Sequence, residues 1–173
     1  MKKNKYRLWS VLVTVTALVF VVCGMDSMMI QRKLSSLADD IDKKKILSAD
    51  LVYFPLDLTT QVPINTSSFE GVDSKIAEQW GIKQVSFGGA SAERAWNEIA
   101  ACLRSSRFSR SLLQINPFFP DLRIKVTFRS TGNEILGTLY FDGEGTYGLV
   151  DRSRGVYSGC LFSMIKHYMM GIH

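Results

Sequence analysis

The residues most able to do chemistry match known enzyme motifs only in part. Ser163 and Lys166 have the S-x-x-K spacing of penicillin-recognising enzymes, but the S-D-N and K-T-G motifs that those enzymes also need do not occur in the sequence. Residues 143–148 match the G-x-G-x-x-G string of dinucleotide-binding folds. That motif needs a helix next, to hold the phosphates, whereas the segment that follows is strand-like. We therefore predict a hairpin there, no catalytic residue, no cofactor and no metal.

Two of the three cysteines are candidates for a structural bond. Cys102 lies on the apolar face of a predicted helix, and Cys160 lies in the last predicted strand. In an oxidising compartment these two would form a disulfide, which would stabilise the fold by about 4 kcal/mol by closing a long loop. Two separate buried thiols are the alternative. Neither cysteine belongs to a C-x-x-C motif, so redox catalysis and zinc binding are not expected.

A basic strand face is the main candidate for binding an anion. In residues 121–129 apolar and polar side chains alternate, which places Arg123, Lys125 and Arg129 together on one face. This face could attract an anionic ligand or an acidic partner. A solvated face of the sheet is the ordinary explanation.

The C-terminal half also holds more large apolar side chains than a small sheet needs for its core. We interpret the surplus as the lining of a cavity for a small apolar ligand, or as an interface. The residues concerned are Phe118, Phe119, Phe128, Tyr140, Phe141, Tyr147, Tyr157, Phe162, Tyr168, Met169 and Met170.

The charge of the 173-residue chain is unevenly placed. Lysine and arginine number 21 against 16 acidic residues, a net of +5, but four of these cations lie in residues 1–7. Residues 26–173 are therefore almost neutral, and direct binding of nucleic acid is not expected.

An uncharged run over residues 8–25 predicts a membrane anchor. As a helix the run would span about 27 Å, close to the hydrocarbon thickness of a bilayer. The preceding cations would keep residues 1–7 in the cytoplasm as a short tip and place the rest outside a bacterial inner membrane. A signal peptide cleaved after Gly24 is the alternative.

Residues 26–45 have the pattern of an amphipathic stalk helix. Ile30, Leu34, Leu37 and Ile41 are spaced four, three and four residues apart, with charged residues between them. This stripe would either dock on the chain's own domain or bind a membrane protein partner.

Residues 46–173 predict one α+β domain. Its main helix covers residues 92–107, with Ser91 as N-cap, and residues 164–172 form a short apolar helix or tail at the end of the chain. The expected fold is a curved antiparallel β-meander or small barrel packed on that one main helix. The predicted meander strands are 121–129, 134–142, 146–151 and 156–162, with earlier strands at 51–58 and 82–87.

This plan of tip, anchor, stalk and β-rich outer domain resembles the small bitopic partners of membrane-bound winged-helix regulators, the ToxS, VtrC and PsaF kind. The resemblance covers topology, length and the β-rich outer half, so no functional residue is carried over from it. It implies a non-enzymatic accessory protein whose outer domain pairs with the regulator, stabilises it and helps to sense an envelope signal. The alternatives are a structural subunit of a secretion or pilus system, and an immunity protein against an exported toxin.

Overall fold

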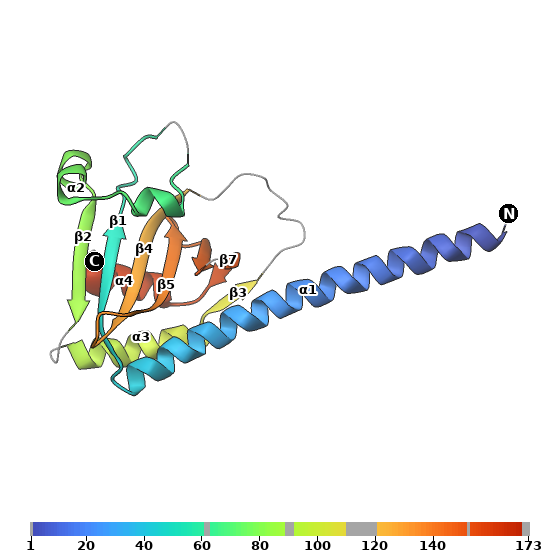
Figure 1. Cartoon of the computed structure of the whole chain (residues 1–173), viewed down its shortest axis with the longest axis horizontal. Helices are drawn as coiled ribbons and strands as arrows, with labels where there is room; N and C mark the ends of the chain where they lie inside the picture. Colours follow the sequence, from blue (N-terminus) through green and yellow to red (C-terminus); the bar gives the residue numbers. More distant parts are fainter. Residues whose placement is uncertain (1, 61–62, 89–91, 110–120, 152, 171–173) are drawn as a thin grey trace.

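The computed structural model describes residues 2–60, 63–88, 92–109, 121–151 and 153–170, and shows an α+β fold built on one antiparallel sheet (Figure 1). The helices and strands alternate irregularly along the chain, as expected for this class. The elements are α1 (Lys2–Asp42), β1 (Ile46–Tyr53), the 3₁₀ helix η1 (Thr66–Phe69), α2 (Ser74–Trp80), β2 (Lys83–Gly88), α3 (Glu93–Ser105), β3 (Arg107–Ser109), β4 (Leu122–Ser130), β5 (Ile135–Asp142), β6 (Tyr147–Val150), β7 (Ser153–Ser158) and α4 (Leu161–Met170).

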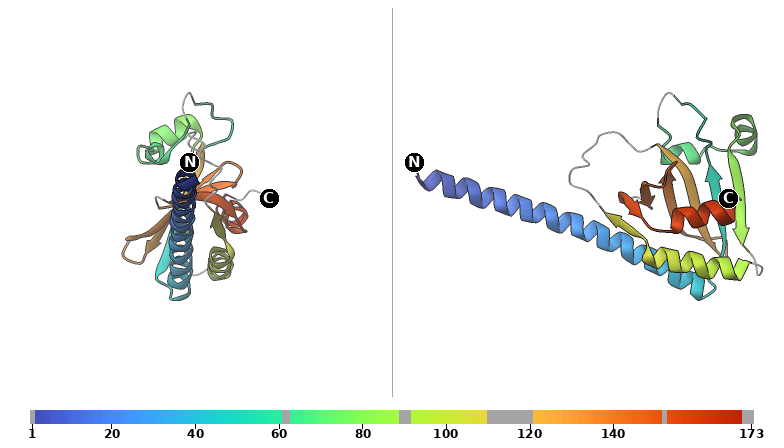
Figure 2. Two further views of the ribbon diagram at one scale, coloured as in Figure 1. Left: turned by 90° about the vertical axis from the view of Figure 1, so that its right-hand side faces the viewer. Right: turned by 180° about the vertical axis from the view of Figure 1, so that it is seen from behind.

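Helix α1 is a single helix of 41 residues with two different surroundings. Its second half lies along α3 at the side of the domain, while its first half projects away from the domain (Figures 1 and 2). The predicted stalk is therefore the C-terminal half of α1.

The structure corrects the prediction of a membrane anchor. Over the residues that it describes, none of the helices combines the length and the apolar character needed to cross a bilayer. This finding contradicts the transmembrane helix predicted for residues 8–25, and with it the single-pass location in a bacterial inner membrane. The uncharged run is not an element of its own but the middle of α1, which begins at Lys2 and ends at Asp42.

The seven strands pair antiparallel in the order β2-β1-β4-β5-β6-β7-β3. The predicted meander is confirmed as β4 to β7, and the two earlier strands extend it beyond β4. Because β2 and β3 are edges, the sheet is open and not a barrel. Arg107, which was assigned to the end of the main helix, instead begins β3, which pairs with β7.

The main core lies between one face of the sheet and three helices, not the one main helix predicted. The apolar stripes of α1, α3 and α4 all pack against this face, so each helix buries the side that water would otherwise meet. The largest fully buried side chains are those of Leu34, Leu37, Leu51, Ile99, Leu103, Ile124, Val126, Phe128, Leu139, Phe141, Leu161 and Ile165.

A smaller core covers one end of the opposite face. The segment between β1 and β2 folds over it and contributes Phe54, Ile64 and Phe69. The pairing of β4 with β5 is irregular between Leu122 and Ile124, which places Leu122 in this smaller core and Ile124 in the main one. The uniform face predicted for strand 121–129 therefore holds only from Ile124 onward.

Candidate interaction surface

The clearest surface feature is the projecting part of α1, residues 9–29, which we name the α1 arm. Val11, Leu12 and Val13 are each 61% exposed, and three consecutive helical residues point in directions about 100° apart. The apolar surface therefore extends around most of the helix. The large apolar side chains of the arm that are more than half exposed are Trp9, Val11, Leu12, Val13, Val15, Leu18, Val21, Met25, Met28 and Met29.

The predicted partner-binding stripe lies next to the arm but faces the chain's own domain. Ile30, Leu34, Leu37 and Ile41 are all buried in the main core, beside the side chains of α3 and the sheet. Of the two interpretations of this stripe, docking on its own domain is the arrangement in the structure. The buried stripe holds α1 to the domain and so fixes the direction of the arm.

Ionic contacts at the C-terminal end of α1 reinforce this docking. Arg104 on α3 donates hydrogen bonds to Asp39, at 2.9 Å, and to Asp42. These hydrogen bonds raise the pKa of Arg104, which keeps the guanidinium charged. Lys33 on α1 also lies 3.6 Å from the carboxylate of Asp151, beyond the end of β6. The sequence analysis missed these pairs because they join residues far apart in the chain.

Cys102 and Cys160 lie at disulfide distance, with their sulfur atoms 1.97 Å apart and their Cα atoms 5.4 Å apart. The pair joins α3 to the start of α4. Next to it, the buried hydroxyl of Ser106 donates to the carbonyl oxygen of Cys102 at 2.7 Å and lies 3.2 Å from the hydroxyl of Tyr157. This cluster connects α3, β7 and α4, so its role is structural.

The basic face predicted on β4 is engaged by contacts within the chain. The Nε atom of Arg129 lies 2.5 Å from Oδ2 of Asp50 on β1, which ties β4 to β1. Lys125 places its Nζ atom 5.9 Å from the ring centroid of Tyr140 on β5. Arg129 and Lys125 therefore interact with side chains of the two strands that neighbour β4.

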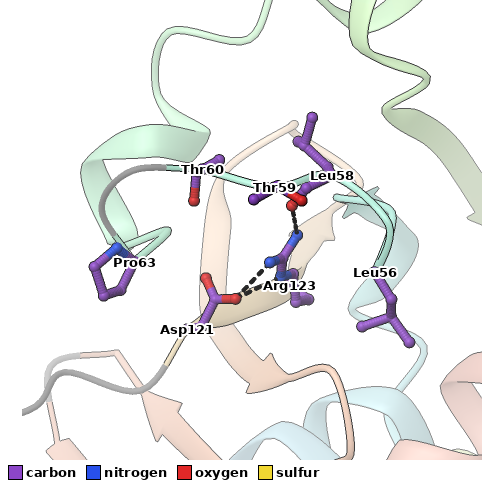
Figure 3. Close-up of a pocket in the computed structure, with 7 residues that line it drawn as sticks. All are labelled: Leu56, Leu58, Thr59, Thr60, Pro63, Asp121 and Arg123. Atoms are coloured by element: carbon purple, nitrogen blue, oxygen red, sulfur yellow. Dashed lines mark hydrogen bonds and ion pairs between the residues drawn. The ribbon is translucent and has the colours of Figure 1, made fainter.

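Arg123, the third member of that face, is buried beside a shallow cavity of about 310 Å³ (Figure 3). Its guanidinium donates to Asp121 Oδ2 and to the backbone oxygens of Pro55 and Leu58 at 2.7 and 3.0 Å. Arg123 therefore fixes the loop after β1. The cavity is lined by Leu56, Leu58, Thr59, Thr60, Pro63, Asp121 and Arg123, none of which is aromatic.

The surplus aromatic residues that the structure describes pack mainly against one another. The ring of Phe141 lies 5.1 Å from that of Tyr157 and 5.8 Å from that of Phe162, between centroids. Phe118 and Phe119 lie outside the described residues, and the side chains of residues 168–170 are not described either. Five of the described rings, those of Phe128, Tyr140, Phe141, Tyr157 and Phe162, therefore belong to the two cores, and none of the described rings lines the cavity beside Arg123.

The glycine-rich string at residues 143–148 lies in the hairpin between β5 and β6, as predicted. Strand β6 begins at Tyr147, inside the G-x-G-x-x-G segment, and continues past its end, where a phosphate-binding helix would be needed. Lys166 lies over the ring of Phe162, at 4.7 Å from its centroid. Within the described ranges no three histidine, cysteine or acidic side chains gather as metal ligands would. No family model, no curated protein and no solved structure matches this chain.

Proposed function

We propose that this chain is a non-enzymatic accessory protein that binds and stabilises another protein through the α1 arm. The observation that carries the proposal is the exposure of ten large apolar side chains among those that the structure describes along the arm. Each square ångström of apolar surface removed from water contributes about 25 cal/mol, so contact with an apolar partner is strongly favoured. Exposed apolar surface of this extent is typical of interaction sites.

The partner surface that best complements the arm is an apolar helix. The arm offers aliphatic and methionine side chains on a regular helix, and such surfaces pack ridges into grooves against another helix. Methionine side chains adapt to irregular partner surfaces, and Met25, Met28 and Met29 lie at the domain end of the arm. Docking of the rest of α1 orients the arm before binding, which reduces the entropy lost on association.

A regulator of transcription is the class of partner implied by the resemblance to small regulator-binding proteins. Residues 26–173 carry almost no net charge, so direct binding of this domain to DNA is not expected. Any effect on transcription would therefore pass through the bound regulator. Stabilising that regulator is the activity that we propose.

Site-specific photocrosslinking in the native cells tests the proposal. A photoreactive amino acid placed at Leu12, Val15 or Leu18 should give one protein adduct of defined mass. The same group at Ile135 on β5, which is 55% exposed and distant from the arm in sequence, is the matched control and should not give that adduct. Adducts with lipid alone, or the same adduct from Ile135, would contradict the proposal.

The stabilising role has its own test once the adduct is identified by mass spectrometry. Leu18→Asp places a charge on the arm, where Leu18 is 64% exposed and supports no domain packing. The variant should fold normally while the abundance of the crosslinked protein falls several-fold. An unchanged abundance would show that the arm binds this protein without stabilising it.

A further inference from the structure

We propose that strand β2 pairs with the β2 strand of a second copy of this chain. The two strands would run antiparallel about a two-fold axis at Ser86, joining the two sheets into one. This inference goes beyond the proposed function and does not depend on it, because β2 and the α1 arm are separate surfaces (Figure 1).

Strand β2 is an edge of the sheet formed by the described residues. It pairs with β1 over six consecutive residue pairs without any register shift, whereas the pairings of β4 with β1 and with β5 both contain irregularities. Native proteins normally protect such edges with proline, with charged residues or with bulges. In β2 only Lys83, at the start of the strand, is charged, and proline is absent from the strand.

The side chains of β2 are complementary to themselves about Ser86. In an antiparallel pair centred there, Val85 stands opposite the partner's Phe87, and Gln84 stands opposite the partner's Gly88. Val85 and Phe87 lie on the core side, and the ring of Phe87 packs 5.1 Å from that of Trp96 on α3. Pairs of aromatic and β-branched residues directly opposite each other stabilise antiparallel sheets.

Charge and nearby apolar surface also favour a second copy of this chain as the partner that pairs with the edge of β2. The two Lys83 side chains would project from positions about 20 Å apart along the paired strands, beyond the Debye length of about 8 Å. Repulsion between them would be small. Trp80, at the end of α2 and three residues before the start of β2, is a large apolar side chain that is 47% exposed.

Cysteine crosslinking tests both the dimer and its register. The experiment uses the full chain with Cys23→Ser, in mild detergent that covers the α1 arm. In Ser86→Cys the two introduced residues would face each other at a Cα separation of about 5 Å, which a disulfide can bridge. In Gln84→Cys, which changes another exposed residue on the same face, they would be about 14 Å apart and could not be bridged.

We expect Ser86→Cys to give at least about tenfold more crosslinked dimer than Gln84→Cys. Equal yields, or no dimer from either variant, would overturn the proposal. A second measurement leaves Ser86 intact, because Ser86 donates a hydrogen bond to Asp50 at 2.7 Å. Spin labels on Lys83→Cys should show an intermolecular distance near 20 Å by pulsed electron resonance. The absence of any intermolecular distance below about 40 Å would likewise overturn it.

Discussion

Met29 and Ile30 are consecutive residues of α1, yet 53% of Met29 is exposed and only 4% of Ile30. Rotation by about 100° between neighbours explains part of this difference, but Met25 and Met28 are also more than half exposed. Beyond Ile30, in contrast, Leu34, Leu37 and Ile41 are all buried. The change from Met29 to Ile30 therefore marks the point at which the exposed arm ends and α1 begins to pack against the domain.

The same substitution should lower the free energy of unfolding much more in the second half of α1 than in the first. Leu34→Ala removes a fully buried side chain from the main core and should lower the free energy of unfolding by about 3 kcal/mol. Leu18→Ala, in the arm, should change it by less than about 0.5 kcal/mol, because Leu18 is 64% exposed. Urea unfolding of both variants measures the difference. Similar losses at the two positions would show that the arm packs against the domain.

Periodicity in the sequence predicted most local elements because each depends on neighbouring residues, although the first strand lies at Ile46–Tyr53 and not at residues 51–58. The stripe of Ile30, Leu34, Leu37 and Ile41 has helical spacing, and strands β4 to β7 lie near their predicted positions. The uncharged run at residues 8–25 shows the limit of this reasoning. Its lack of charge predicted an anchor, whereas no helix among the described residues has the length and the apolar character to cross a membrane, and the run lies within α1.

Contacts between distant residues were the part that sequence patterns could not reveal. The alternation in strand 121–129 placed Arg123, Lys125 and Arg129 on one face, but not Asp50 beside Arg129 or the carbonyl of Leu58 beside Arg123. Those acceptors come from segments more than 60 residues away. Two of the basic residues predicted to form a binding face, Arg123 and Arg129, therefore make hydrogen bonds and ion pairs within the chain. Strand β3 was not predicted, because a strand of three residues is too short to show alternation of apolar and polar side chains.

The disulfide between Cys102 and Cys160 should contribute strongly to stability. It closes a loop with a sequence separation of 58 residues, so its loss should lower the free energy of unfolding by about 4 kcal/mol on the chain-entropy model. Cys102→Ser with Cys160→Ser should show this loss in chemical unfolding. Treating the unmodified protein with a reductant should reproduce it, while the double variant should not respond. A response of the double variant to reductant would point to another bond.

Stability at alkaline pH should depend on Tyr140. Burial raises the pKa of Tyr140 above its ordinary value of about 10, with smaller contributions from Glu70 and Asp151. Above pH 10 the unfolded chain therefore loses this proton before the folded protein does, so the contribution of Tyr140 is complete below pH 10 and is lost as the pH rises through the pKa of the folded state.

Tyr140→Phe isolates this effect from the titration of lysines in the same range. Unfolding free energies measured from pH 8 to pH 11 should fall less steeply for the variant than for the unmodified protein. In the variant, the absorbance of ionised tyrosine should also show one fewer tyrosine that ionises above its ordinary pKa. Parallel pH profiles for the two proteins would rule out a stabilising role for the neutral phenol.

Gly148 on β6 permits the close approach of three strands. A Cβ atom at this position would lie 2.8 Å from the Phe108 ring on β3 and 2.9 Å from the backbone oxygen of Tyr140 on β5. Because a backbone oxygen in the sheet cannot move away freely, Gly148→Ala should lower the free energy of unfolding by about 1–3 kcal/mol. Gly71→Ala is the matched control, since an added Cβ there has no atom within 4 Å, and it should leave stability unchanged or raise it by up to about 1 kcal/mol. Thermal and urea unfolding of the two variants compare them directly, and equal stability would mean that β6 shifts to accommodate the methyl group.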